Sequence, residues 1–258
     1  MFSYVPGRTG REEKGEKEMF FDLHCHLLYG VDDGASSLEE MKEMLDLAYA
    51  DGTRAICATP HFSPALFGEN TEKSRCVFAE LREYAAERYP DLYLYLGHEL
   101  GYYGGGLEAL EEKRCRSING SRYVLVDFPE SVSFYELSAG MLRMLRTGYL
   151  PILAHTERYR SLSSHLSWVE EFRENGGVVQ INASSPSSAG LFYRQQARRL
   201  LREGLVDVVS SDGHNTTRRP PRMSVCLDTL SRYCTPEEIR RLTWDNACRI
   251  AGDEAIER

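Results

Sequence analysis

The segment FDLHCHLLYGVDDG, residues 21–34, ends a short apolar run with two histidines one residue apart and continues into an Asp-Asp-Gly turn. In a β-strand, alternate side chains point to the same side and lie about 6.6 Å apart. His24 and His26 can therefore bind one ion while Cys25 faces away. An isolated His-x-His is weak evidence for a metal site, because the same residues also fit ordinary core and turn. The ends of the other predicted strands are needed to choose between a metal site and ordinary core and turn.

Six further apolar segments, rich in β-branched or aromatic residues, follow the first one, and amphipathic helical patterns lie between several of them. The predicted strands are 20–26, 54–61, 92–99, 122–129, 149–157, 177–184 and 206–214, and the predicted helices are 37–50, 72–88, 134–146 and 191–203. This alternation predicts an α/β fold of parallel strands joined by helical crossovers. A chain of 258 residues is a common size for one barrel domain.

The composition excludes several classes of protein. A net charge of −8 argues against a general nucleic-acid coat, since phosphate-backbone binding needs accumulated Lys and Arg. No apolar run approaches the roughly 20 residues of a membrane span. Seven scattered cysteines without a CxxC pair predict a reducing, cytoplasmic location. Residues 1–18 are charged and Gly-rich, which predicts a disordered extension before a domain at 19–258.

Polar side chains that can bind a cation stand at the ends of six of the seven predicted strands. They are His24, His26, His61, Glu99, Asp127, His155, Asp212 and His214. The carboxyl ends of the strands share one rim in a parallel barrel, so these side chains are expected to converge there. His98 and His165 do not fit this pattern, and we interpret both as structural or surface residues.

Acidic residues meeting at such a rim would repel one another and resist desolvation unless cations were present. The candidates are too many for one zinc ion, which takes about four ligands. Their mixture of imidazoles and carboxylates suits two or three divalent ions of the manganese, iron or zinc type. Asp32 is interpreted as a turn residue, and for Asp33 the turn and metal interpretations both stay open at this point.

Two arginines stand beside the expected ligands, Arg158 in AHTERY and Arg219 in SDGHNTTRRPP. Guanidinium groups bind phosphate oxygens in a bidentate manner, and an acidic protein needs local positive charge to hold an anion. We therefore expect Arg158 and Arg219 to hold a substrate phosphate. Glu157 is left without a role.

These residues resemble the polymerase and histidinol phosphatase (PHP) superfamily and, within it, the bacterial capsule-type tyrosine-protein phosphatases of the CpsB/YwqE kind. The matching stretches are DLHCHLLYGVDDGASSLEE, GTRAICATPHF, LGHEL, YVLVDFP, LPILAHTERY and VDVVSSDGHNTTRRPP, in that order from about residue 19 to 221. General members of the superfamily share the His and Asp positions but usually lack GVDDG and the closing RPP.

The resemblance implies a distorted (β/α)7 TIM-like barrel, the PHP fold, with three divalent metal ions, manganese first and iron or zinc as alternatives. It assigns His24, His26, Glu99 and Asp212 to one ion; Glu99, Asp127 and His155 to a second; Asp33, His61 and His214 to a third. Arg158 and Arg219 would hold the phosphate. Relatives typically carry Glu where this chain has Asp127, which is shorter by roughly 1.5 Å and predicts looser binding of the second ion. Thr156 replaces the usual proline, and Met19 is expected to be the natural start.

The function implied is hydrolysis of phosphotyrosine on a protein by a metal-activated hydroxide, with a bacterial tyrosine autokinase as partner in capsule or exopolysaccharide regulation. The alternatives are a histidinol-phosphatase-like enzyme acting on a small molecule, an exonuclease, and a regulatory module that binds phosphotyrosine without turnover. The acidic charge disfavours the exonuclease. A cysteine phosphatase needs Cys-x5-Arg, and the instances at 76–82 and 226–232 lie in helical patterns without the required glycines.

Overall fold

The computed structural model of the protein describes residues 18–258. The extension predicted at residues 1–18 lies outside this range except for Glu18, so its disorder stays a prediction. The strands are short: β1 (Phe20–Cys25), β2 (Thr53–Ala58), β3 (His61–Phe62), β4 (Tyr93–Leu96), β5 (Glu99–Gly101), β6 (Tyr123–Asp127), β7 (Leu150–Leu153), β8 (Val178–Asn182) and β9 (Val208–Ser210).

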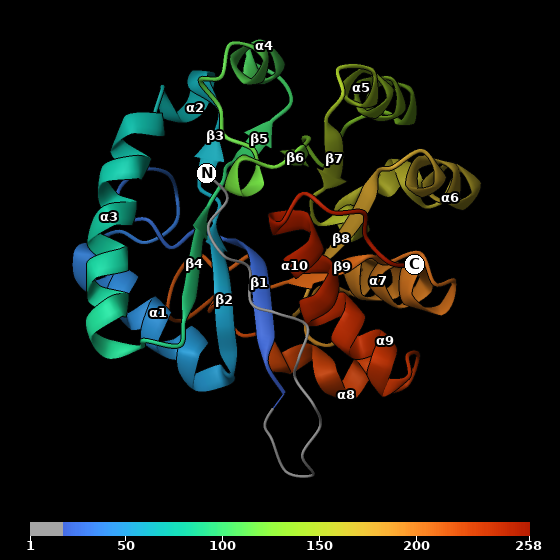
Figure 1. The fold of residues 1–258 in the computed structure, drawn as a ribbon. Coiled ribbons are helices and arrows are strands. Elements are labelled where there is room, and N and C mark those ends of the chain that lie inside the picture. The colour runs from blue at the N-terminus through green and yellow to red at the C-terminus, as the bar shows by residue number, and fades with distance from the viewer. Residues whose placement is uncertain (1–17) are drawn as a thin grey trace.

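The strand pairs among residues 18–258 are all parallel, and they form two curled sheets with the orders β1-β2-β4 and β3-β5-β6-β7-β8-β9. Helices cover their outer faces (Figure 1). Helices α1 (Leu38–Asp51) and α3 (Thr71–Arg88) lie beside β2 and β4, and α5 (Phe134–Arg146), α6 (Leu166–Glu174) and α7 (Leu191–Arg202) lie beside the strands from β7 onward. The prediction of a mixed α/β fold with parallel strands is confirmed. The distorted (β/α)7 barrel stays a prediction.

Two of the predicted strands are each divided into two. The segment 54–61 becomes β2 and β3, because Pro60 has no N–H to donate to a neighbouring strand. The segment 92–99 becomes β4 and β5 around Gly97, where a Cβ atom would lie 2.9 Å from the side chain of Ile118. After each break, the strand continues in the second sheet, and His61 pairs with Glu99 in register.

The first and last strands meet through the chain that follows β9. Asp212 donates its backbone N–H to the carbonyl of His24 (2.9 Å), and His26 donates to the carbonyl of Gly213 (2.8 Å). Cys25 and Gly213 form a parallel bridge. These bonds place residues from the two ends of the domain side by side at one rim.

The helices largely follow the predicted pattern. They are α1 (Leu38–Asp51), α2 (Pro64–Phe67), α3 (Thr71–Arg88), α4 (Gly106–Glu111), α5 (Phe134–Arg146), α6 (Leu166–Glu174), α7 (Leu191–Arg202), α8 (Leu227–Leu230), α9 (Pro236–Arg240) and α10 (Asn246–Ala251). Ser37 caps α1 by accepting from the N–H of Glu40, and Ser133 and Glu136 form a capping box on α5. The four predicted helices agree with α1, α3, α5 and α7 within one or two residues. The prediction lacked α6 and the C-terminal helices.

The core consists of three clusters of buried apolar side chains. One lies between β1, β2 and helices α1 and α3, a second joins the sheet faces to α10 through Trp244, and the largest packs under α5, α6 and α7. On α5 the buried positions include Leu137, Met141 and Met144, whereas Leu142 is exposed. Leu142 lies about 100° around the helix from Met141, which turns it toward solvent.

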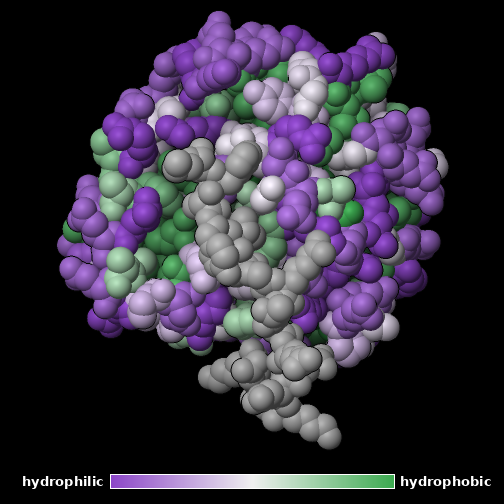
Figure 2. Space-filling model, in the orientation of Figure 1, coloured by the Kyte–Doolittle hydropathy of each residue, from purple (hydrophilic) through white to green (hydrophobic). Residues whose placement is uncertain are grey.

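The molecular surface in view in Figure 2 is mostly hydrophilic, with smaller hydrophobic areas between the charged residues. Among residues 18–258, no helix has the length and apolar character required to cross a membrane.

Candidate metal centre

The predicted convergence of polar side chains at the strand ends is present in the structure. His24 lies in β1 and His26 just beyond it, His61 and Glu99 open β3 and β5, and Asp127 ends β6. His155 follows β7, and Asp212 and His214 follow β9. Asp33, on the loop after β1, completes a set of nine neighbouring side chains. Their role as metal ligands stays a prediction.

Glu99 occupies the centre of this set and is fully buried. Its Oε2 lies 3.3 Å from His24 Nε2, 3.2 Å from His26 Nε2 and 3.0 Å from His61 Nδ1. Its Oε1 lies 3.0 Å from His155 Nε2. One carboxylate thus faces four imidazoles.

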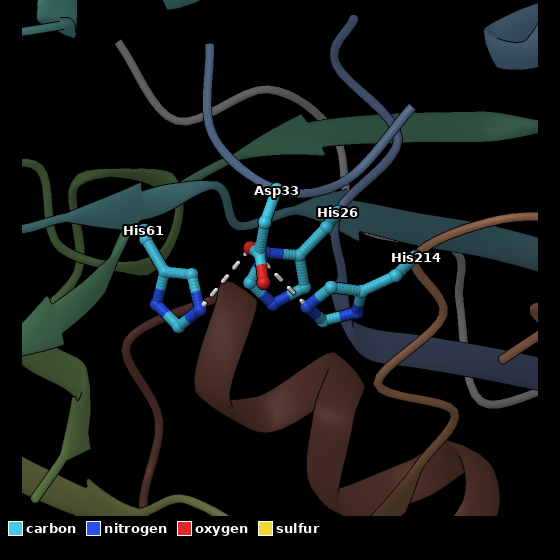
Figure 3. A group of neighbouring side chains, drawn as sticks. All are labelled: His26, Asp33, His61 and His214. Carbon is cyan, nitrogen blue, oxygen red and sulfur yellow. Dashed lines mark ion pairs between the residues drawn. The ribbon is translucent and has the colours of Figure 1, made fainter. Parts of the chain in front are cut away.

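The group most open to solvent surrounds Asp33, whose side chain is 54% exposed. Asp33 Oδ1 lies 3.5 Å from His61 Nε2 and 3.6 Å from His214 Nε2, as the dashed lines in Figure 3 show. His26 lies behind them, with its ring centroid 3.8 Å from that of His214. The resemblance grouped Asp33, His61 and His214, and the structure places His26 with them.

The buried group contains the histidines of the opening segment. His24 and His26 direct their Nε2 atoms toward each other at 3.1 Å, and Asp212 Oδ1 lies 3.4 and 3.6 Å from these two atoms. Cys25 packs on the opposite side, in the core beside α1 and α3. The strand geometry inferred from the sequence is therefore correct.

Asp127 lies at the third group, with His61 and Glu99. The resemblance paired Asp127 and Glu99 with His155, and His155 Nε2 lies 3.6 Å from Asp127 Oδ1. The hydroxyl of Tyr159 donates to the same oxygen at 3.1 Å. Asp127 is thus held by a residue that the sequence analysis did not assign.

The donor set fits divalent cations. Imidazole nitrogens and carboxylate oxygens are ligands for manganese, iron and zinc. Glu99 Oε2 and His214 Nε2 are buried, and among residues 18–258 neither atom makes a hydrogen bond of suitable geometry, although imidazole nitrogens lie close to Glu99 Oε2. Buried polar atoms of this kind are normally satisfied, and a cation in the cluster would satisfy both.

The pKa values of the cluster reflect charges held close together in a dry site. Burial raises the pKa of Asp212, but His24 and Arg158 outweigh it, so the net pKa lies well below the usual range. Burial dominates at Asp127, whose pKa is raised. His214 has a pKa lowered to about 2 by burial and by the neighbouring His26. A neutral His214 keeps a lone pair available for a metal ion.

Two of the predicted ligands adopt left-handed backbone conformations that residues other than glycine rarely use. The φ angle is 33° at His155 and 55° at Asp212. Such conformations cost on the order of 1–3 kcal/mol each and gather at functional sites, where the surrounding structure holds them. The fold therefore tolerates strain to direct these two side chains into the cluster.

Both arginines singled out in the sequence lie at the cluster. Arg158 Nη2 and Arg219 Nη2 are 2.8 and 2.6 Å from Asp212 Oδ2. Arg218, next in the chain, is exposed. The structure thus places two guanidinium groups beside the expected ligands, and their binding of phosphate stays a prediction.

Several residues that shape the cluster escaped the sequence analysis. Asp32 was interpreted as a turn residue, and it does accept from the N–H of Gly34. It also holds the imidazole of His26, so the turn interpretation alone was incomplete. Gln180 and Asn182 are buried on β8 and contact His24 and Asp212. The sequence did indicate a role for these two residues, because both are polar and occupy alternate positions of an apolar strand.

Residues interpreted as structural occupy structural positions. His98 points away from the cluster, packs on Phe62 and accepts from the N–H of Arg116. His165 stacks on Phe134 with ring centroids 3.7 Å apart. Glu157, which had no assigned role, is buried and accepts from the N–H of Asn182.

The cysteines do not form a competing catalytic centre. All seven are free. Cys226 is buried, and burial raises the pKa of its thiol to about 12, so it is not a thiolate at neutral pH. Cys76 is exposed on α3, a regular helix rather than a phosphate-binding loop.

Comparison with known proteins gives consistent matches over nearly the whole chain. A family profile described as "Capsular polysaccharide synthesis, CpsB/CapC" matches residues 20–251. The tyrosine-protein phosphatase CpsB of Streptococcus pneumoniae is 35% identical over 91% of this chain and 99% of its own length. The tyrosine-protein phosphatase YwqE of Bacillus subtilis is 31% identical over 92% and 93%, respectively.

The solved structures agree. The chain superposes with a TM-score of 0.81 and 27% identity on a structure from a study of YwqE from Bacillus subtilis and CpsB from Streptococcus pneumoniae, described as unique metal-dependent tyrosine phosphatases. The match covers 92% of this chain and 96% of that one.

Proposed function

The chain belongs to the CpsB/CapC family of capsular polysaccharide synthesis, and on this premise we propose that it is a metal-dependent protein-tyrosine phosphatase. One observation carries the proposal. Glu99 lies within 3.3 Å of the nitrogens of four imidazoles from three separate segments, while two arginines contact the neighbouring Asp212. A centre that binds cations and a site that binds an anion thus share one rim.

The proposed fold is a distorted seven-stranded (β/α) barrel. Support comes from the two divided strands, since β2 with β3 and β4 with β5 each continue one predicted strand. The bonds between β1 and the chain after β9 support closure of the ring. Catalytic residues at the carboxyl ends of the strands are typical of such barrels.

The proposed cofactor is a set of three divalent ions, manganese first and iron or zinc as alternatives. Its ligands would be the nine residues gathered at the rim: His24, His26, Asp33, His61, Glu99, Asp127, His155, Asp212 and His214. When bound, such ions act as Lewis acids toward phosphate oxygens and lower the pKa of water. Three divalent ions against four carboxylates leave an excess of about two positive charges for a phosphate dianion.

Arg158 and Arg219 would bind and orient the phosphate. Each guanidinium offers a planar pair of N–H donors that matches two phosphate oxygens. Both now donate to Asp212 Oδ2, so an arriving phosphate would compete with one carboxylate oxygen. Because Asp212 also receives an N–H from Asn182, it keeps a partner when the arginines turn to substrate.

An aromatic side chain beside the cluster supports an aryl phosphate as the substrate. Phe67 lies parallel to the ring of His61, with an interplanar angle of 4° and centroids 5.5 Å apart, and it is partly exposed. The phenol ring of a phosphotyrosine at the cluster could stack on it. We therefore propose phosphotyrosine proteins as substrates, and a bacterial tyrosine autokinase in the cytoplasm as the partner.

Substrate comparison tests the proposal. Release of phosphate from a phosphotyrosine peptide, histidinol phosphate and a nucleic-acid end would be measured with added Mn²⁺. The peptide should be hydrolysed with the highest kcat/KM. His155→Ala and Asp212→Asn should abolish turnover and reduce the metal content. Faster hydrolysis of histidinol phosphate would instead identify a small-molecule phosphatase, and peptide binding without phosphate release would identify a regulatory module.

A further inference from the structure

Strand β8 supplies none of the nine predicted ligands, yet two of its side chains reach the cluster. Gln180 and Asn182 alternate along the strand and are 0% and 3% exposed. Buried amides are costly unless every donor and acceptor is paired, so their hydrogen bonds define what they do.

The orientation of the Gln180 amide follows from a backbone group. The N–H of His155 can only donate, and it lies 2.6 Å from Gln180 Oε1. His24 Nδ1 lies 3.3 Å from the same oxygen. A carbonyl oxygen has no proton to give, so Nδ1 of His24 must carry the proton of this bond. Nε2, the other ring nitrogen of His24, then faces Glu99.

The same logic continues along the strand. Gln180 Nε2 donates to Asn182 Oδ1 at 3.0 Å, which leaves Asn182 Nδ2 as a donor. That nitrogen lies 2.7 Å from Asp212 Oδ2. Asp212 Oδ1 is left to face His24 and His26. Each bond in the chain fixes the direction of the next.

We infer that Gln180 and Asn182 form a directed amide chain that sets the tautomer of His24 and the rotation of Asp212. Both are positioning residues, because they act through the predicted ligands and not on substrate. The inference rests on the proposed metal-dependent function. Strand β8 would thus hold His24 and Asp212 so that an unprotonated nitrogen of the first and a free carboxylate oxygen of the second can bind one ion.

The test uses three variants in the full chain. Gln180→Met removes the carbonyl and the NH2 group of the side-chain amide at similar volume. Gln180→Glu keeps an acceptor for His155 and His24. Asn182→Asp removes the donor to Asp212. Gln195→Met, at an exposed position of α7, is the matched control. The readouts are the ¹⁵N chemical shifts of the His24 ring in metal-free protein and the dissociation constant for Mn²⁺ by chelator competition.

Gln180→Met should convert His24 from the Nδ1–H form to a mixture of tautomers. It should also weaken Mn²⁺ binding about 10- to 100-fold, the usual effect of losing a hydrogen-bond partner of a ligand. Gln180→Glu should keep the Nδ1–H form. Asn182→Asp should keep it too, but should weaken Mn²⁺ binding by about tenfold or more because two carboxylates then face each other. Gln195→Met should match the wild type in both readouts.

Wild-type ¹⁵N shifts and Mn²⁺ affinity in a folded Gln180→Met protein would overturn the inference. If Gln180→Met fails to fold, an unchanged Mn²⁺ affinity in Asn182→Asp would do so. Absence of Mn²⁺ binding by the wild type would instead refute the proposed function, while the His24 shifts in metal-free protein would still test the amide chain.

Discussion

Asp32 Oδ2 lies 2.7 Å from His26 Nδ1, and both side chains are fully buried. The same oxygen accepts the backbone N–H of His61 at 2.8 Å. One carboxylate therefore joins the loop after β1 to the start of β3. It also directs Nε2 of His26 toward the cluster, because Nδ1 is occupied by the bond to Asp32.

Replacing Asp32 by Asn should weaken metal binding about 10- to 100-fold while the protein still folds, since the side chain orients a ligand without being one. Chelator competition with Mn²⁺ would measure the loss. Asp228→Asn, at an exposed position of α8, is the control. Equal affinities for the two variants would show that the bond to His26 is only structural.

Asp127 should bind its ion more loosely than a longer carboxylate would. Asp127→Glu is expected to raise the affinity of the weakest ion, since it adds about 1.5 Å of reach. Tyr159→Phe should lower it by about tenfold, because the variant loses the hydroxyl that donates to Asp127 Oδ1. Metal content measured against free Mn²⁺ would distinguish the three proteins. Weaker Mn²⁺ binding by Asp127→Glu than by the wild type would contradict this explanation.

Arg219→Ala should lower kcat/KM for a phosphotyrosine peptide by about 10²- to 10³-fold, the scale of losing one preorganised charge donor. Arg218→Ala provides an adjacent control, because Arg218 is exposed. Steady-state kinetics would measure both variants. Wild-type kinetics in Arg219→Ala would show that Arg219 does not bind the substrate.

Cys76→Ser should leave the rate unchanged, because Cys76 stands on a regular helix and no cysteine chemistry is required. Phosphate release under saturating Mn²⁺ is the measurement. An inactive but folded Cys76→Ser protein would refute the metal mechanism.

Removing divalent ions should destabilise the fold, because the buried carboxylate of Glu99 then loses a counter-charge. Adding Mn²⁺ back at 100 times its Kd should raise the free energy of unfolding by about 2.7 kcal/mol per site. Thermal melting with and without chelator would show the difference. A melting temperature that does not respond to Mn²⁺ would argue against binding to the native state.

The sequence predicted the gathering of residues at the rim because all of them except Asp33 stand at the end of a predicted strand, and the ends of parallel strands meet. His24, His61 and His155 could be chosen on this basis alone. Asp33 needed the family resemblance, since a loop residue next to a glycine fits an ordinary turn equally well. Asp127 was found at a strand end, and the departure from the usual Glu was visible in the sequence.

The supporting hydrogen bonds could not be derived in the same way. Gln180 contacts His24 across 156 positions of sequence, and the partner of a buried amide depends on which strands become neighbours. The division of β2 from β3 had a local cause in Pro60, whereas the break at Gly97 depends on the distant Ile118. Sequence periodicity describes single elements, and these features arise between elements.

The backbone bonds that join His24 and His26 to residues 212 and 213 can form only late in the synthesis of the chain. The histidines near the amino terminus leave the ribosome early, but their partners are made almost two hundred residues later. A truncated product that ends before residue 212 lacks Asp212 and His214, two of the nine clustered side chains. We therefore expect such a product to lack the proposed phosphatase activity.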